Sequence, residues 1–217
     1  MRSSVDSKEI VFQTLRERIA SHQLPPGSRL SEQQLAEEFH VSRTVVRDVF
    51  LKLEQRGLIS RSHKKSAVVV RLELSEVFEI YVVREMLEGL CARLAAKNGP
   101  KESWQDLVDL FGAPMEESVK SGDLEEYIKN IRTLRMRMIA AADSPILAGM
   151  LDLINDKISE ISRRIIILPG RAQQGLQEHR AILDALRRGD PETSERLRRE
   201  NIRSSAEYLS RYKRFVL

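Results

Sequence analysis

"VSRTVVRDVFLKL", residues 41–53, is the stretch that decides the fold of the N-terminal region, because it begins polar and cationic and ends apolar. Arg43 and Arg47 are four residues apart, so on a helix both side chains point the same way. Four apolar residues recur on another face at i, i+3, i+4 and i+7 spacing: Val46, Val49, Phe50 and Leu53. We therefore predict a helix that buries one face in a core and offers its cationic start to an external partner.

Two further helices are predicted before this one. Residues 7–24 have the periodicity of an amphipathic helix, and "PPG" at 25–27 is expected to end it. Four of its residues are expected to face the core: Ile10, Val11, Leu15 and Ile19. Ser31 followed three residues later by Gln34 is a capping-box pattern, which predicts the start of a second helix.

A hairpin is predicted after the third helix, which should span residues 42–56 and stop at Gly57. Residues 58–72, "LISRSHKKSAVVVRL", contain two short β-prone runs around a polar, basic tip. Three helices and a hairpin indicate a winged helix-turn-helix domain, which we expect to span residues 1–73.

Residues 74–217 carry the pattern of an all-helical bundle. The helix predicted at residues 75–97 is apolar over much of its circumference, as expected if it contacts both its own core and a partner subunit. Breaks containing Gly, Pro and Asp then divide the chain into five further predicted helices. The predicted fold class is mainly α, a winged helix-turn-helix domain followed by an all-α helical bundle.

Charge and composition narrow the class of protein. Residues 1–71 hold 13 Lys and Arg against 8 Asp and Glu, whereas the remaining residues hold 23 against 24, so the positive excess indicates a polyanion partner for the N-terminal domain. The longest aliphatic run, residues 165–168, is too short to cross a bilayer, and residues 1–10 lack the apolar stretch of a secretory signal. The single cysteine, Cys91, fits a reducing compartment. We expect a cytoplasmic protein with no membrane partner.

Residues 11–71 resemble the N-terminal domain of the GntR family of bacterial transcription regulators. The elements "PPGSRLSE", "LAEEFHVSRTVVR" and "GLI" stand in the family's order and spacing. His40 occupies a turn position where the family usually has glycine, and histidine is among the residues that tolerate positive φ. The resemblance implies that the chain binds double-stranded DNA.

The start of a recognition helix enters the major groove, where arginine can pair with guanine and a helix N-terminus can bind phosphate. The residues predicted to contact DNA on the two helices are Gln33, Ser42, Arg43, Thr44, Val45 and Arg47, and those at the hairpin tip are His63, Lys64 and Lys65. The alternative is that the two arginines form only a solvated face, paired with carboxylates such as Asp48.

Residues 83–96 and 178–190 resemble the helical effector-binding domain of the FadR-like subgroup. Many members bind a divalent metal there through one aspartate and three histidines. At those positions this chain carries Ile131, Arg135, His179 and Asn201. One histidine does not hold a transition metal, so we predict no metal site and no cofactor.

An arginine at such a position changes the chemistry of the bundle interior, because a buried guanidinium favours an anionic partner. The residues predicted to bind a small carboxylate or other organic-anion effector are Arg84, Arg135, His179 and Asn201. The alternative is that Arg84 pairs with Glu88 one turn later and that Arg135 finds an internal acid or extends to water.

The function expected from these observations is a homodimeric repressor that binds a pseudo-palindromic operator and responds to the organic anion. A metal-dependent sensor of the same family is one alternative. An enzyme with an appended DNA-binding domain is another, but we find no catalytic residues, no Gly-rich phosphate loop and no nucleophile–base pair.

Overall fold

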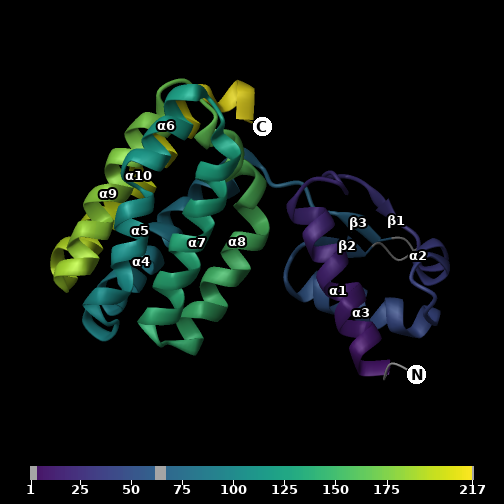
Figure 1. The fold of residues 1–217 in the computed structure, drawn as a ribbon. Coiled ribbons are helices and arrows are strands. Elements are labelled where there is room, and N and C mark those ends of the chain that lie inside the picture. Colours follow the sequence, from purple (N-terminus) through teal and green to yellow (C-terminus); the bar gives the residue numbers. More distant parts are fainter. Residues whose placement is uncertain (1–3, 62–66, 217) are drawn as a thin grey trace. The chain divides into compact units, whose positions relative to one another are not determined.

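The computed structural model describes residues 4–61 and 67–216. The chain divides into two compact units, Met1–Glu73 with Asn155–Glu160 and Leu74–Ile154 with Ile161–Leu217. The first unit contains three helices and a small sheet, and the second is helical throughout the part that the structure describes (Figure 1).

The first unit has the winged helix-turn-helix order that the sequence predicts. Its elements are α1 (Ser4–Ala20), β1 (Arg29–Leu30), α2 (Glu32–Glu38), α3 (Arg43–Gln55), β2 (Ile59–Arg61) and β3 (Ala67–Val69). The hairpin strands β2 and β3 pair antiparallel, and β1 adds to the other edge of β3, giving the strand order β1-β3-β2. The short strand β1 was not expected from the sequence.

Helix α3 is one residue shorter at each end than the predicted 42–56, and it buries the predicted face. Val46, Val49 and Leu53 are 0% exposed and Phe50 is 1% exposed. Ser42 is the N-cap residue, and its hydroxyl accepts a hydrogen bond from the Val45 amide at 3.3 Å. His40, in the turn before the helix, has a φ of 52°, which confirms that a histidine can occupy this glycine-type position.

Helix α1 differs from the prediction in two ways. Ile10 is 46% exposed, whereas Phe12 is 6% exposed and faces the core with Val11, Leu15 and Ile19. Residues two apart on a helix lie on nearly opposite sides, so Ile10 and Phe12 cannot both face inward. The helix also ends at Ala20, before the prolines, because His22 has a positive φ of 56° that no α-helix continues.

The second unit is a bundle of long helices, and three short helical pieces lie between the first long helix and the next along the chain. Its elements are α4 (Leu74–Asn98), η1 (Lys101–Trp104), α5 (Gln105–Leu110), α6 (Ala113–Ser121), α7 (Leu124–Ala142), α8 (Pro145–Ile166), α9 (Arg171–Arg188) and α10 (Pro191–Val216). Helix α4 packs along both α10 and α7, and α10 also packs along α9 (Figure 1). No helix in the described ranges combines the length and the hydropathy that a membrane crossing needs.

The prediction of five helices after α4 was wrong between residues 100 and 121, where one predicted helix is three pieces. The break between α5 and α6 is at Gly112, whose ψ of −131° is not helical, and Pro114 follows in the first turn of α6. A Cβ at residue 112 would lie 2.9 Å from the Asp109 carbonyl oxygen. The chain can therefore turn this sharply only with glycine at this position.

We predict that Phe50→Ala lowers the free energy of unfolding of the first unit by about 3–5 kcal/mol, because it leaves a cavity between α3 and its neighbours. The neighbouring Leu51 is 45% exposed, so Leu51→Ala is a matched control that should change stability by less than about 1 kcal/mol. Urea titration followed by circular dichroism measures both. Equal losses for the two variants would contradict the buried face assigned to α3.

Candidate nucleic-acid interface and buried cationic cluster

The start of α3 presents two cations and two hydroxyl-bearing residues. The side chains of Arg43 and Arg47 are 54% and 52% exposed, and Ser42 and Thr44 are also exposed. Val45 is half-buried, so it offers less surface than the sequence predicted. The positive end of the helix dipole lies at the same residues, and this favours an anionic partner.

Glu32 holds both arginines. Its Oε2 lies 2.8 Å from Arg47 Nε and 3.6 Å from Arg43 Nη2, and the Glu32 side chain is only 12% exposed. The predicted alternative partner was wrong, because Asp48 pairs instead with Lys8 at 2.7 Å. Glu32 begins α2, so it belongs to a different helix from the arginines that it orients.

Of the remaining predicted DNA contacts, the structure describes Gln33 alone. Gln33 is exposed in the first turn of α2, where its side-chain nitrogen donates to Glu37 Oε1 at 3.1 Å. His63, Lys64 and Lys65 lie outside the described residues. The basic residue nearest to them that the structure describes is Arg61, which pairs with Glu54 at 2.7 Å.

In the second unit, one buried carboxylate is surrounded by three guanidinium groups. Glu88 on α4 is 1% exposed, and its Oε1 lies 3.2 Å from both Arg84 Nε and Arg135 Nε. Its Oε2 accepts from Arg198 Nη2 at 2.8 Å. Burial alone raises the pKa of Glu88, but attraction to Arg198, Arg135 and Arg84 outweighs it and holds the pKa well below its usual range.

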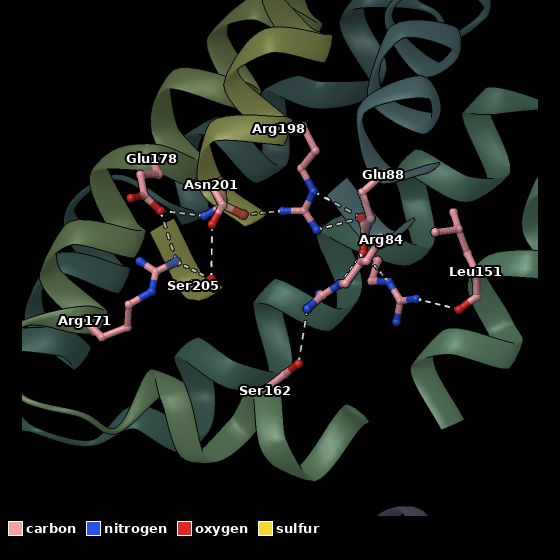
Figure 2. Close-up of polar contacts among 10 residues, drawn as sticks. Arg84, Glu88, Leu151, Ser162, Arg171, Glu178, Arg198, Asn201 and Ser205 are labelled. Atoms are coloured by element: carbon pink, nitrogen blue, oxygen red, sulfur yellow. Dashed lines mark hydrogen bonds and ion pairs between the residues drawn. The ribbon is translucent and has the colours of Figure 1, made fainter. Parts of the chain in front are cut away.

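This arrangement continues through α10 to α9 (Figure 2). Arg198 Nη1 donates to Asn201 Oδ1 at 2.8 Å, and the Asn201 amide donates to Glu178 Oε2 at 2.6 Å. Arg171 Nη2 lies 3.1 Å from the same Glu178 oxygen and donates to Ser205 Oγ at 2.8 Å. We call the residues of this network the cationic cluster: Arg84, Glu88, Arg135, Arg171, Glu178, Arg198, Asn201 and Ser205.

His179 lies next to the cationic cluster but is not one of its charges. It is 4% exposed, and its Nδ1 is 3.0 Å from the hydroxyl of Tyr127. Burial, followed by repulsion from Arg198 and Arg171, lowers the pKa of His179 well below its usual value. The imidazole is therefore neutral near pH 7 and adds hydrogen-bonding groups without charge.

The residues at the four metal positions do not fit a metal ion. Arg135 directs its guanidinium to Glu88 and donates to the Leu151 carbonyl at 3.0 Å, and the Asn201 amide bridges Arg198 and Glu178. Within residues 4–61 and 67–216, no group of three or more His, Cys, Asp or Glu side chains has the geometry to hold a metal.

Three of the four predicted effector residues, Arg84, Arg135 and Asn201, belong to the cationic cluster. The fourth, His179, lies beside it. Arg84 pairs with Glu88, which was the alternative expected from the sequence, and donates to Ser162 Oγ at 3.3 Å. Sequence reasoning missed Arg198 and Arg171. No local signal marks Arg198 within "ERLRRENIR", because adjacent arginines there point to solvent or to surface carboxylates.

A winged helix-turn-helix unit with an exposed arginine pair, joined to a helical bundle with a buried polar centre, defines the class of bacterial transcription regulators that combine a DNA-binding domain with an effector-binding domain. The model of the bacterial regulatory proteins of the gntR family matches residues 7–69, and the FCD domain model matches residues 79–204. The chain belongs to the GntR family, with a C-terminal FCD domain.

Individual relatives agree with this assignment. Over 179 residues the chain is 29% identical to the "Probable D-xylose utilization operon transcriptional repressor" of Paenarthrobacter nicotinovorans. The aligned region covers 82% of this chain and 77% of that protein. The chain is 24% identical to the HTH-type transcriptional regulator McbR of Escherichia coli strain K12, over 82% of this chain and 81% of McbR. The solved structure of E. coli McbR/YncC has the same fold, with a TM-score of 0.76 at 23% identity over 98% of this chain and all of that one.

We predict that Glu88→Gln lowers the free energy of unfolding by about 3–5 kcal/mol at neutral pH, because it leaves the buried guanidinium groups without their shared carboxylate. The folded-state pKa of Glu88 is depressed, so its stabilisation is present above the unfolded pKa and is lost as the pH falls toward the folded value. The difference between wild type and variant should therefore narrow below about pH 4.3.

Urea unfolding followed by Trp104 fluorescence tests this, because Trp104 is the only tryptophan in the chain and is buried in the second unit. Glu79→Gln, an exposed position on the same helix, is the control and should have little effect. A loss for Glu88→Gln that equals that of the control, or that does not change with pH, would show that the carboxylate is not charged in the folded protein.

Proposed function

We propose that this protein is a transcriptional repressor that binds a pseudo-palindromic operator as a homodimer. Its affinity for the operator changes when a small organic anion binds. The observation that carries the proposal is the arginine pair at the capped start of α3. Arg43 and Arg47 are half-exposed and are held on one side by Glu32, so they are oriented without being covered.

The two guanidinium groups can reach DNA from this arrangement. The side chains of Arg43 and Arg47 are half exposed, although Glu32 is only 12% exposed, so they can extend from Glu32 toward a guanine edge or a phosphate. The hydroxyls of Ser42 and Thr44 lie at the positive end of α3, where phosphate oxygens are favoured. DNA binding of this kind weakens steeply with salt because counterions are released.

Support for a homodimer comes from an exposed apolar stripe on α4. Val82, Val83, Met86 and Leu90 are 68%, 52%, 53% and 41% exposed, although they lie on a helix whose other faces pack within the bundle. Adjacent apolar residues of this size on the surface are typical of an interface. Two copies joined through this stripe would present two α3 helices to two half-sites.

Support for an organic-anion effector comes from the cationic cluster, which places four arginines inside the helical domain that in this family binds effectors. The relative from P. nicotinovorans is named as a repressor of a sugar-utilization operon. A catabolic repressor that senses an anionic metabolite is consistent with both observations.

We predict that Arg43→Ala reduces discrimination between the operator and a scrambled duplex by about 1–3 kcal/mol in the difference between the two binding free energies. Fluorescence anisotropy with an operator selected from random duplexes, over a range of salt concentrations, measures this. Lys52→Ala is the matched control, because Lys52 lies on the same helix but pairs with Glu9 on α1. Retained discrimination in Arg43→Ala would remove Arg43 from the base-reading surface.

We predict that Met86→Glu converts the dimer to monomers and weakens operator binding at least about tenfold, because both half-sites are then no longer engaged together. Size-exclusion chromatography with light scattering gives the mass. Ile167→Glu is the control, since Ile167 is an apolar residue of similar exposure, 59%, that caps the end of α8 and does not belong to the α4 stripe. A dimeric Met86→Glu protein would place the interface elsewhere.

A further inference from the structure

Arg171 has donor groups that nothing in the described chain satisfies. It is the first residue of α9 and is 4% exposed. Its Nη2 is bound to Ser205 and Glu178, but its Nε and Nη1 atoms are buried and have no hydrogen-bond partner among the described residues. Native proteins rarely leave buried donors without acceptors, so this position indicates a missing acceptor.

The guanidinium of Arg171 is fixed in place rather than free to turn toward solvent. The ring of Tyr208 covers one of its faces, with 5.6 Å from Cζ to the ring centroid, and the Tyr208 hydroxyl donates to Gln174 Oε1. Because Ser205 and Glu178 hold Nη2, the direction of the two unsatisfied nitrogens is set by packing. Pre-organised donors of this kind bind a ligand with little loss of side-chain entropy.

Nη1 of Arg171 and the hydroxyl of Tyr127 lie around the same point, above Gly175. A Cβ built on Gly175 would be 2.9 Å from each of these two atoms. Glycine one turn into α9 is therefore what allows both polar groups to approach the helix. Tyr127 is itself positioned by its hydrogen bond with His179 and by its edge-on contact with Phe111.

The electrostatics of this point favour an anion. The positive end of α9, an 18-residue helix, begins at Arg171 itself. His179 contributes no charge, and the carboxylate of Glu178 is shared between Arg171 and the Asn201 amide. A carboxylate or phosphate oxygen is the acceptor that best matches a guanidinium with unused N–H groups.

We propose that Arg171 is the anchor of the effector, and that its Nη1 group, with the Tyr127 hydroxyl beside it, binds the oxyanion head of a small organic acid or phosphate ester. This rests on the proposed function in that the bound anion is the regulatory ligand. Arg84, Arg135 and Arg198 then hold Glu88 and position α4, α7 and α10, while Arg171 contacts the ligand.

The test uses the full-length protein with four probes at matched ionic strength: chloride, inorganic phosphate, succinate and glucose 6-phosphate. Isothermal titration calorimetry and thermal unfolding are measured on wild type, Arg171→Gln and Arg187→Gln. Arg187 is on the same helix, but its side chain is 46% exposed and it pairs with Asp184, so it controls for loss of one positive charge. Phosphate and succinate separate the two kinds of oxyanion head.

We expect at least one of the three oxyanions to bind wild type and Arg187→Gln, and to bind Arg171→Gln at least about tenfold more weakly. Tyr127→Phe should weaken the same probe about threefold or more through loss of the hydroxyl. If Arg171→Gln does not fold, Arg171→Lys, which keeps the charge but not the fork, takes its place with the same expected direction. The Nε–H signal of Arg171 is assigned in NMR spectra as the arginine signal that is missing from Arg171→Lys. This signal should shift when the wild type is titrated with the probe.

Equal affinity of wild type and Arg171→Gln would overturn the proposal, and so would a complete absence of binding, which would mean that water alone occupies the point. Operator anisotropy with and without the bound probe separates anion binding at Arg171 from control of DNA binding. Oxyanion binding at Arg171 that leaves operator affinity unchanged would contradict its role as effector. Failure of wild type to bind any operator would contradict the proposed function while leaving the site intact.

Discussion

The buried contact of the Glu88 carboxylate with three guanidinium groups is the constraint on which the second unit depends. Each arginine comes from a different position in the bundle: Arg84 one turn away on α4, Arg135 on α7 and Arg198 on α10. A buried charge without a partner is strongly unfavourable. Separation of these helices would leave the carboxylate and the guanidinium groups unpaired, so the four charges hold the helices together. The cationic cluster therefore fixes the helix arrangement in which Arg171 and Tyr127 lie around one point.

The chain uses arginine–carboxylate pairs in two environments with opposite consequences. At the start of α3 the two arginine side chains that pair with Glu32 are half exposed, so they can meet a second anion from solvent. Glu88 and its partners are buried, where the same chemistry is hard to break. The first kind suits a surface that must exchange its partner for DNA, and the second suits a rigid frame around a ligand.

Features set by local sequence were predictable, and those set by distant contacts were not. Periodicity and capping residues identified the buried face of α3, the Ser42 cap and the winged helix-turn-helix order. They did not reveal β1, because its two residues are specified by pairing with β3 rather than by their own pattern. The arginines of α3 pair with Glu32 and not with Asp48, and this too depends on a distant contact, the packing of α2 against α3.

The candidate site shows the same limit. The sequence placed Arg135, His179 and Asn201 at positions where the family resemblance implies metal ligands. In the structure Arg135 and Asn201 belong to the cationic cluster, and His179 lies beside it. Arg171 could not be singled out beforehand, because its significance lies in two nitrogen atoms without acceptors, which only the tertiary structure exposes.

The central claim is that an anion held inside the helical unit is coupled to DNA held by α3. Coupling between two binding sites is reciprocal, so the anion must bind the free protein and the operator-bound protein with different affinities. Calorimetric titration of the tightest-binding oxyanion into the protein, with and without saturating operator duplex, measures this directly. The account predicts two affinities whose ratio equals the factor by which the anion changes operator affinity, and identical affinities would contradict it.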